Sequence, residues 1–148
     1  MELIALTAVM GVLLYSNITA MKQPTAAPER ASVESILDRQ VAALNEGGPI
    51  RVDEITVLTK ASREADMLVI DYAVSLPEEL ATRDVFETAL RERQLPMRCS
   101  DKAILGLLRT GAMVRLRYTI LNAEPVVLDV SAPICDALAA QNSSSISR

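Results

Sequence analysis

The two cysteines are the residues whose type and spacing most directly allow chemistry. Cys99 and Cys135 are the only cysteines among the 148 residues, and the chain contains no histidine. Two cysteines without histidine cannot complete a tetrahedral zinc site, and this spacing is not that of a CxxC redox pair. Two interpretations remain, a single disulfide or two buried free thiols. We expect the disulfide, because both cysteines lie at the ends of predicted elements and an apolar, exportable segment precedes them.

Other side chains give no support for catalysis. The serines have no histidine and no SxxK motif to act as a general base. Nothing in the pattern places Asp71, Glu78 or Glu79 opposite another carboxylate across a cleft, and Lys102 is expected to be solvated. The sequence therefore predicts a protein that is not an enzyme and has no cofactor and no metal.

Arg115, Arg117 and Tyr118 are the candidate partner-binding residues, together with the helix before their strand. The two arginines alternate with apolar residues, which is typical of a solvated strand face on which Asp129 is a cross-strand partner. The alternative is a docking surface for an acidic partner. The net charge is −4 with only three lysines, which disfavours nucleic acid, because phosphate binding needs clustered cations.

Three helices are expected to position these residues. The first follows Ser32 as N-cap and ends at Gly47-Gly48-Pro49, and the second follows Thr82 and is closed by Leu95-Pro96. The third follows Ser100 as N-cap and ends at Gly111. Apolar side chains recur along them at three- and four-residue spacing, namely Val33, Ile36, Leu37, Val41 and Leu44, then Val85, Phe86, Ala89 and Leu90, then Ile104, Leu107 and Leu108.

Alternating apolar residues indicate two pairs of strands. The first pair consists of a run over 55–59 (Ile55, Val57, Leu58 and Thr59) and a run with alternate apolar positions over 68–76, joined by the polar link 60–66 as an antiparallel hairpin. The second pair runs over 113–120 and 126–130 around the turn Asn122-Ala123-Glu124-Pro125, and a short helix over 135–140 is expected to follow. We therefore predict an α+β fold in which three helices pack on one face of an antiparallel sheet of about four strands, in the order α-β-β-α-α-β-β.

The chain is divided by composition into four parts. Residues 1–21 are apolar and are expected to form a hydrophobic helix, either a cleaved signal peptide or a single transmembrane anchor. Glu2 precedes the uncharged run 3–21 and Lys22 follows it, which is the reverse of the charge order in a usual export signal. Residues 22–30 are expected to be a proline-containing linker, 31–140 the α+β domain, and 141–148 a disordered serine-rich tail.

A run of residues between the cysteines resembles a known pattern. Met97-Arg98-Cys99-Ser100, Leu107-Leu108-Arg109-Thr110-Gly111-Ala112, Arg117-Tyr118 and Ile134-Cys135 resemble the quorum-sensing-regulated virulence factor family and the beta-type pilotins of type II secretion. The resemblance implies a small α+β domain with one disulfide that acts by binding in the bacterial envelope. Pilotins are lipoproteins with a cysteine at the end of the signal sequence. This chain has none before Cys99, so we expect it to lack a lipid and an outer-membrane escort role.

These observations lead to one expected function and one alternative. We expect a non-enzymatic accessory module that binds another envelope protein, such as a subunit of a membrane or secretion assembly. The alternative is a periplasmic protein that binds a small apolar ligand or a lipid. The expected location is periplasmic or secreted, or else in the inner membrane through residues 1–21, with the domain in the periplasm.

Overall fold

The computed structural model describes residues 32–77 and 82–145. The predicted N-terminal helix, the linker and Glu78 and Glu79 lie outside these residues. Across the described part no helix has the length and apolar character needed to cross a membrane. The elements are, in order, α2 (Val33–Asn45), β1 (Ile50–Arg51), β2 (Thr56–Glu64), β3 (Met67–Val74), α3 (Arg83–Ala89), η2 (Leu90–Gln94), α4 (Leu95–Arg98), α5 (Lys102–Arg109), β4 (Met113–Ile120), β5 (Val126–Val130) and α6 (Ala132–Ser145).

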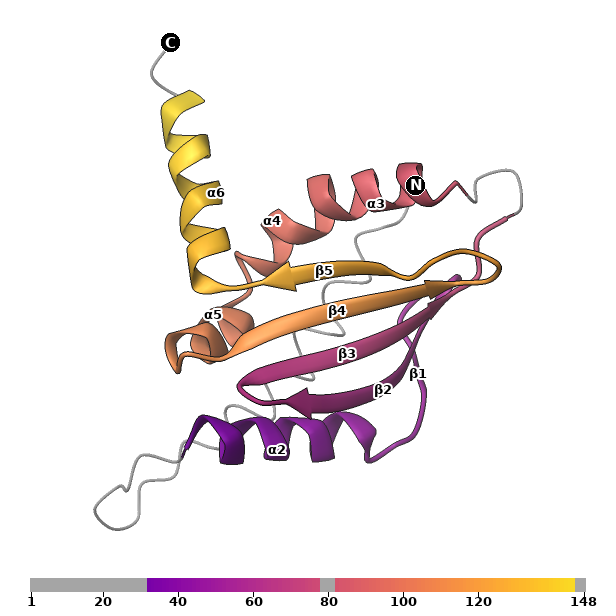
Figure 1. Cartoon of the computed structure of the whole chain (residues 1–148), viewed down its shortest axis with the longest axis horizontal. Helices are drawn as coiled ribbons and strands as arrows, with labels where there is room; N and C mark the ends of the chain where they lie inside the picture. Colours follow the sequence, from indigo (N-terminus) through magenta and orange to yellow (C-terminus); the bar gives the residue numbers. More distant parts are fainter. Residues whose placement is uncertain (1–31, 78–81, 146–148) are drawn as a thin grey trace.

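The sheet has five strands in the order β1-β2-β3-β4-β5 and is mixed (Figure 1). The prediction of an antiparallel sheet of about four strands was wrong in two respects. β1 is a two-residue edge strand, and β3 and β4 run parallel. The parallel pairing arises because the connection between β3 and β4 contains helices, which return the chain to the end of the sheet from which β3 starts.

The first hairpin is tighter than expected. β2 and β3 extend through most of the predicted link, and the turn consists of Ala65 and Asp66, with Ala65 at φ 51°. A register shift between Leu58 and Lys60 displaces the pairing there. Bulges of this kind change which residues face the core. The prediction ended the first strand at Thr59 because most of the following residues are polar, and β2 instead continues to Glu64.

The second predicted helix does not end at Leu95-Pro96. A π-helical turn, η2, joins α3 to α4, and Pro96 lies in the first turn of α4. Proline is tolerated in a first turn because its missing N–H would have no intrahelical partner there. One continuous helix therefore runs from Arg83 to Arg98, and Val85, predicted on its buried stripe, is 63% exposed.

The N-cap of α5 also differs from the prediction. The Oδ1 atom of Asp101 accepts hydrogen bonds from the backbone N–H groups of Ala103 at 2.8 Å and Ile104 at 3.2 Å. Ser100, the predicted cap, instead donates its hydroxyl to the carbonyl of Pro96 in the preceding helix. A carboxylate beside the positive end of a helix dipole is the stronger of the two acceptors.

The last helix is longer than the predicted 135–140. α6 begins at Ala132 and continues to Ser145, five residues into the stretch expected to form a tail. Figure 1 shows that α6 extends away from the sheet, and Cys135 is its only buried residue. Residues 146–148 lie outside the described part.

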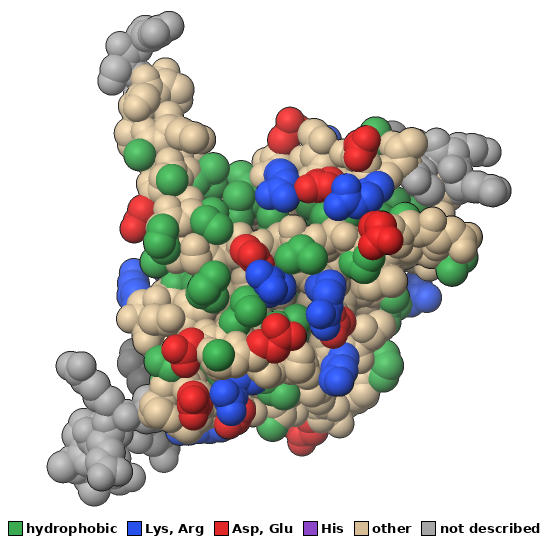
Figure 2. Space-filling view, in the orientation of Figure 1, with side chains coloured by type: hydrophobic (Ala, Val, Ile, Leu, Met, Phe, Trp, Pro, Cys, Tyr) green, Lys and Arg blue, Asp and Glu red, His purple; other side chains and the backbone are tan. Residues whose placement is uncertain are grey.

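The core lies on one face of the sheet. Alternate residues of β3, β4 and β5 join the apolar sides of α2, η2 and α5 in a single cluster that includes Leu37, Leu44, Ile70, Leu90, Ile104, Leu107, Leu116 and Leu128. We call this the inner face. On the opposite, outer face, charged side chains spread over the strands (Figure 2). This separation follows from the strict alternation in β4, where successive side chains point to opposite faces.

Candidate functional site

Cys99 and Cys135 form a disulfide, with 5.3 Å between their Cα atoms. Cys99 directly follows α4, and Cys135 lies in the first turn of α6. The bond ties the end of the long helix α3–η2–α4 to the helix that follows β5. This confirms the predicted pairing and anchors one end of the long helix, which lines the pocket described below from Phe86 to Arg98.

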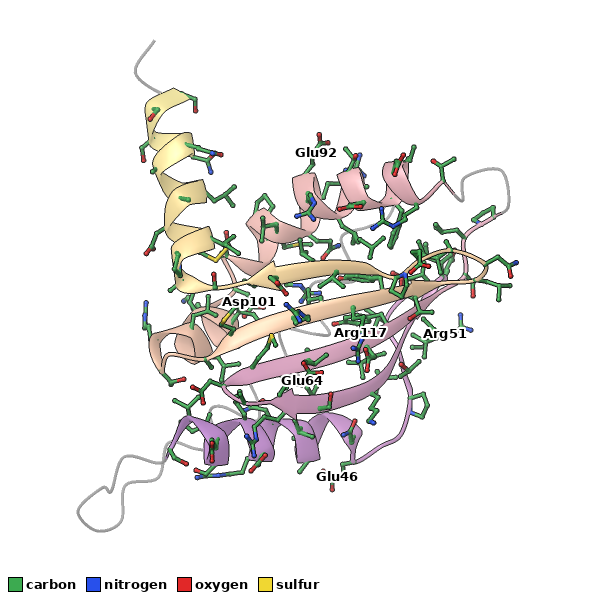
Figure 3. All side chains as sticks on the ribbon, in the orientation of Figure 1. Glu46, Arg51, Glu64, Glu92, Asp101 and Arg117 are labelled. Atoms are coloured by element: carbon green, nitrogen blue, oxygen red, sulfur yellow. A yellow bond between two sulfur atoms is a disulfide. The ribbon has the colours of Figure 1, made fainter. Side chains whose placement is uncertain are left out.

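Arg115 and Arg117 lie on the outer face, and both are paired. Arg115 donates from Nε and Nη2 to the two carboxylate oxygens of Asp129 at 2.7 and 2.9 Å. Arg117 makes the same two-pronged contact with Asp71, with 3.0 Å between Nη2 and Oδ2. Figure 3 shows Arg117 over the sheet between β3 and β4. The predicted cross-strand pairing of Asp129 is confirmed.

At both pairs, hydrogen bonding to the carboxylate and its opposite charge each raise the pKa of the arginine. The guanidinium of Arg115 lowers the pKa of Asp129, first through its hydrogen bonds and then through its charge. The carboxylates in turn raise the pKa of Arg115 and of Arg117. Because each charge has its partner, this surface offers no free cation or carboxylate at these four positions.

Tyr118 points to the opposite face from these arginines and is 4% exposed. It stacks on Tyr72, its neighbour across the parallel strands, with 4.9 Å between ring centroids, and Phe86 meets its edge at 5.7 Å. Burial raises the pKa of Tyr118, and the nearby guanidinium of Arg98 opposes that rise. The structure therefore separates Tyr118 from Arg115 and Arg117 instead of forming one surface from the three.

These aromatic rings line a pocket of about 110 Å³ between the long helix and the loop before β2. Its lining is mainly apolar and includes Val52, Ile55, Tyr72, Phe86, Ala89, Leu90 and Tyr118, with Asp53, Thr56, Arg93, Gln94 and Arg98 as the polar members. Typical sites for small organic ligands occupy roughly 300–1,000 Å³. This pocket is therefore large enough for one side chain and too small for a lipid tail.

Asp53 shapes the rim of the pocket. Its Oδ1 atom accepts hydrogen bonds from the backbone N–H groups of Ile55 and Thr56, both at 2.7 Å. An aspartate that bonds its own backbone in this way fixes a turn. The turn holds Ile55 at the pocket with 38% of its surface exposed. Within residues 32–77 and 82–145 no group of three or more histidine, cysteine or carboxylate side chains could hold a metal ion.

Sequence reasoning missed the polar side of the pocket. Phe86, Leu90, Gln94 and Arg98 are spaced four residues apart, so they lie along one side of the long helix. The stripe was predicted to stop at Leu95-Pro96, before Arg98. The signal available in the sequence was the position of Arg98, which continues the four-residue spacing of Phe86 and Leu90. This signal can be used only if the helix is recognised to continue through Pro96.

Comparison with known proteins gives structural matches. No family model matches the sequence. A search of curated proteins gave no match either. The crystal structure of PA3611 from Pseudomonas aeruginosa, a protein inferred to be secreted, aligns with a TM-score of 0.61 at 18% identity. The alignment covers 74% of this chain and 99% of PA3611.

Two pilotins of type II secretion systems align as well. The pilotin EpsS of Vibrio vulnificus has a TM-score of 0.60 at 17% identity, covering 70% of this chain and 91% of its own. AspS of Vibrio cholerae has a TM-score of 0.52 at 15% identity, covering 70% and 92%. The resemblance noted between the cysteines therefore extends to the fold: this chain is structurally similar to type II secretion pilotins and to PA3611.

Proposed function

We propose that this protein is a non-enzymatic accessory subunit of the bacterial envelope that binds another envelope protein through the pocket beside α3. The observation that carries the proposal is the fold shared with two secretion-system pilotins over 70% of the chain. The disulfide supports a location outside the cytoplasm, because such bonds persist in oxidising compartments. The protein is then periplasmic, secreted, or held at the inner membrane by residues 1–21.

The pocket is the better candidate for the interface. It is open at the surface, its floor is aromatic, and Ile55 stands partly exposed at its rim. Aromatic pockets that receive a side chain are typical centres of binding energy in protein interfaces. Arg115 and Arg117 on the outer face are already neutralised by Asp129 and Asp71, so a partner would have to displace or extend existing pairs there.

A matched pair of substitutions distinguishes the two faces. Ile55 at the pocket and Val127 on the outer face, opposite Arg117, are each 38% exposed. Ile55→Glu and Val127→Glu thus add the same charge at equal exposure. The tagged full-length protein and both variants would be cross-linked in cells, purified from membranes, and the co-purified proteins quantified by mass spectrometry.

We expect the parent and Val127→Glu to retain one envelope protein at near-stoichiometric amounts, and Ile55→Glu to lose at least ten-fold of it. Loss with Val127→Glu alone would move the interface to the outer face with Arg115 and Arg117. Recovery of the parent without any stoichiometric partner would overturn the proposed function. Sequencing the N-terminus of the same material distinguishes a membrane-held protein from a periplasmic or secreted one. An intact Met1 indicates a membrane tether, and a start near Met21 indicates a cleaved signal peptide.

A further inference from the structure

Arg98 is an unusual residue to find in the wall of an apolar pocket. It is 5% exposed, although arginine is rarely buried without a counter-charge. Of the ion pairs formed in the described part of the chain, none includes Arg98. The guanidinium has a hydrogen bond with the side chain of Tyr118, which carries no charge and so does not act as a counter-ion. Desolvating a guanidinium without a counter-ion is costly, so the position calls for a function.

Two polar atoms beside the pocket lack hydrogen-bond partners. One is the Nε atom of Arg98, a donor, and the other is the Oε1 atom of Gln94, an acceptor one helical turn earlier. Both residues line the pocket, and both atoms are closed off from solvent, so rotation of the two side chains would bring an unused donor and an unused acceptor to the same wall. A buried polar group without a partner destabilises the protein, and a ligand that supplies the missing hydrogen bond would remove that cost.

The charge of the lining identifies the ligand. Arg98 and Arg93 contribute two positive charges to the pocket, and Asp53 contributes one negative charge. Asp53 uses its Oδ1 atom to hold the turn at Ile55 and forms no ion pair with Arg98. The remaining excess is positive. Arg98 is the buried one of the two arginines, and a charge-assisted hydrogen bond is stronger where the group is shielded from water.

We propose that the pocket receives a carboxylate carried by a peptide segment of the partner, which pairs with Arg98 while a peptide N–H donates to Oε1 of Gln94. The inference rests on the proposed function, because it names the chemistry of the partner at the same site. The volume of about 110 Å³ suits one short acidic side chain or one chain terminus. The aromatic floor packs against its aliphatic part.

Small blocked amino acids test the pairing without the partner. The probes are N-acetyl-glutamate N-methylamide, the isosteric glutamine compound, and N-acetyl-alanine with a free α-carboxylate. Each is titrated into the ¹⁵N-labelled full-length protein, and the signals of the Arg98 Nε–H group and of the pocket backbone are followed by NMR. We expect saturating shifts in the millimolar range with a carboxylate and at least ten-fold weaker binding of the carboxamide.

Comparison of the two carboxylate probes also identifies whether the carboxylate belongs to a side chain or to a chain terminus. Stronger binding of the blocked glutamate indicates an acidic side chain, and stronger binding of N-acetyl-alanine indicates a chain terminus. Equal binding of carboxylate and carboxamide, or shifts confined to residues outside the pocket, would overturn the inference. This comparison uses the unmodified protein and does not depend on whether any variant folds.

A substitution separates a ligand-binding role from a structural one. Arg98→Met keeps an unbranched apolar stem, removes the buried charge and loses the hydrogen bond with Tyr118. Because removal of the unpaired charge offsets the lost hydrogen bond, we expect the variant to unfold at the same or higher denaturant concentration and to lose carboxylate binding at least ten-fold. Arg109→Met removes an equal charge at the exposed end of α5 and serves as control. If Arg98 were structural, Arg98→Met would unfold more easily than Arg109→Met.

The failure of this inference is distinguishable from failure of the proposed function. A partner that is captured equally by the parent and by Arg98→Met would leave the proposed function intact and overturn the carboxylate pairing. Carboxylate probes that bind at Arg98 in a protein that captures no partner would support the pairing chemistry and overturn the proposed function.

Discussion

Tyr72 and Tyr118 lie directly opposite each other in the parallel pair β3–β4, and their rings stack with an interplanar angle of 13°. Both rings point to the inner face, where they form the floor of the pocket. If the β2–β3 and β4–β5 hairpins did not pair through β3 and β4, the same tyrosines would not be neighbours. The pocket thus depends on the parallel crossover, which brings the ends of β3 and β4 to the same side of the molecule.

We expect Tyr118→Leu to destabilise the protein by about 1–3 kcal/mol, from lost area and from the aromatic contacts with Tyr72 and Phe86. Tyr118→Phe retains the ring and should cost at most half as much. Urea unfolding followed by circular dichroism measures both. Equal costs for the two variants would show that the hydroxyl, and not the ring stack, matters at this position.

The disulfide should contribute about 3–4 kcal/mol to the free energy of unfolding, because it closes a loop between residues separated by 36 positions. The Cys99→Ala/Cys135→Ala double variant is expected to unfold at correspondingly lower denaturant concentration. The parent protein in reducing agent should behave like the variant. A midpoint unchanged by both treatments would contradict a structural role for the bond.

Two glycines should respond in opposite directions to alanine. Gly111 has a φ of +91°, so Gly111→Ala forces a side chain into the left-handed region and should destabilise by roughly 1 kcal/mol. Gly106 lies inside α5 with open space beside it, and Gly106→Ala should stabilise by about 0.5–1 kcal/mol. Thermal unfolding of the two variants checks the sign. Stabilisation at Gly111 would contradict the helix end at this residue.

The Arg115–Asp129 pair should make stability depend on pH under acidic conditions. The pKa of Asp129 is lowered in the folded protein by its hydrogen bonds with Arg115. The folded state therefore binds a proton less readily than the unfolded chain, so the contribution is complete above the ordinary aspartate pKa and is lost as pH falls through the lower, folded value. We expect it to be roughly 0.2–1 kcal/mol, because both side chains are 33% exposed.

Asp129→Asn tests this contribution. The parent protein should be more stable than the variant near pH 6, and the difference should shrink steadily as pH falls below the ordinary aspartate pKa. Urea midpoints measured at several pH values give the comparison. A difference that grows as the solution is acidified would have the wrong sign for a lowered pKa.

The sequence alone determined the local features. The periods of two and 3.6 in the apolar residues placed the inward residues of β4 and β5 and the stripe of α2, and Ser32 accepts a hydrogen bond from the N–H of Ser35 as its N-cap position predicted. These features depend on residues a few positions apart. The disulfide was expected because both cysteines lie at the ends of predicted elements and follow an exportable segment, and two cysteines allow only one pairing.

The tertiary structure decided how these elements combine. The direction of β3 relative to β4, and the passage of the long helix through Pro96, depend on contacts between segments far apart in the chain. Local periodicity carries no information about them, because a strand has the same alternation whether its neighbour is parallel or antiparallel. The pocket and the buried position of Arg98 follow from those two outcomes, so they became visible only once the chain was folded.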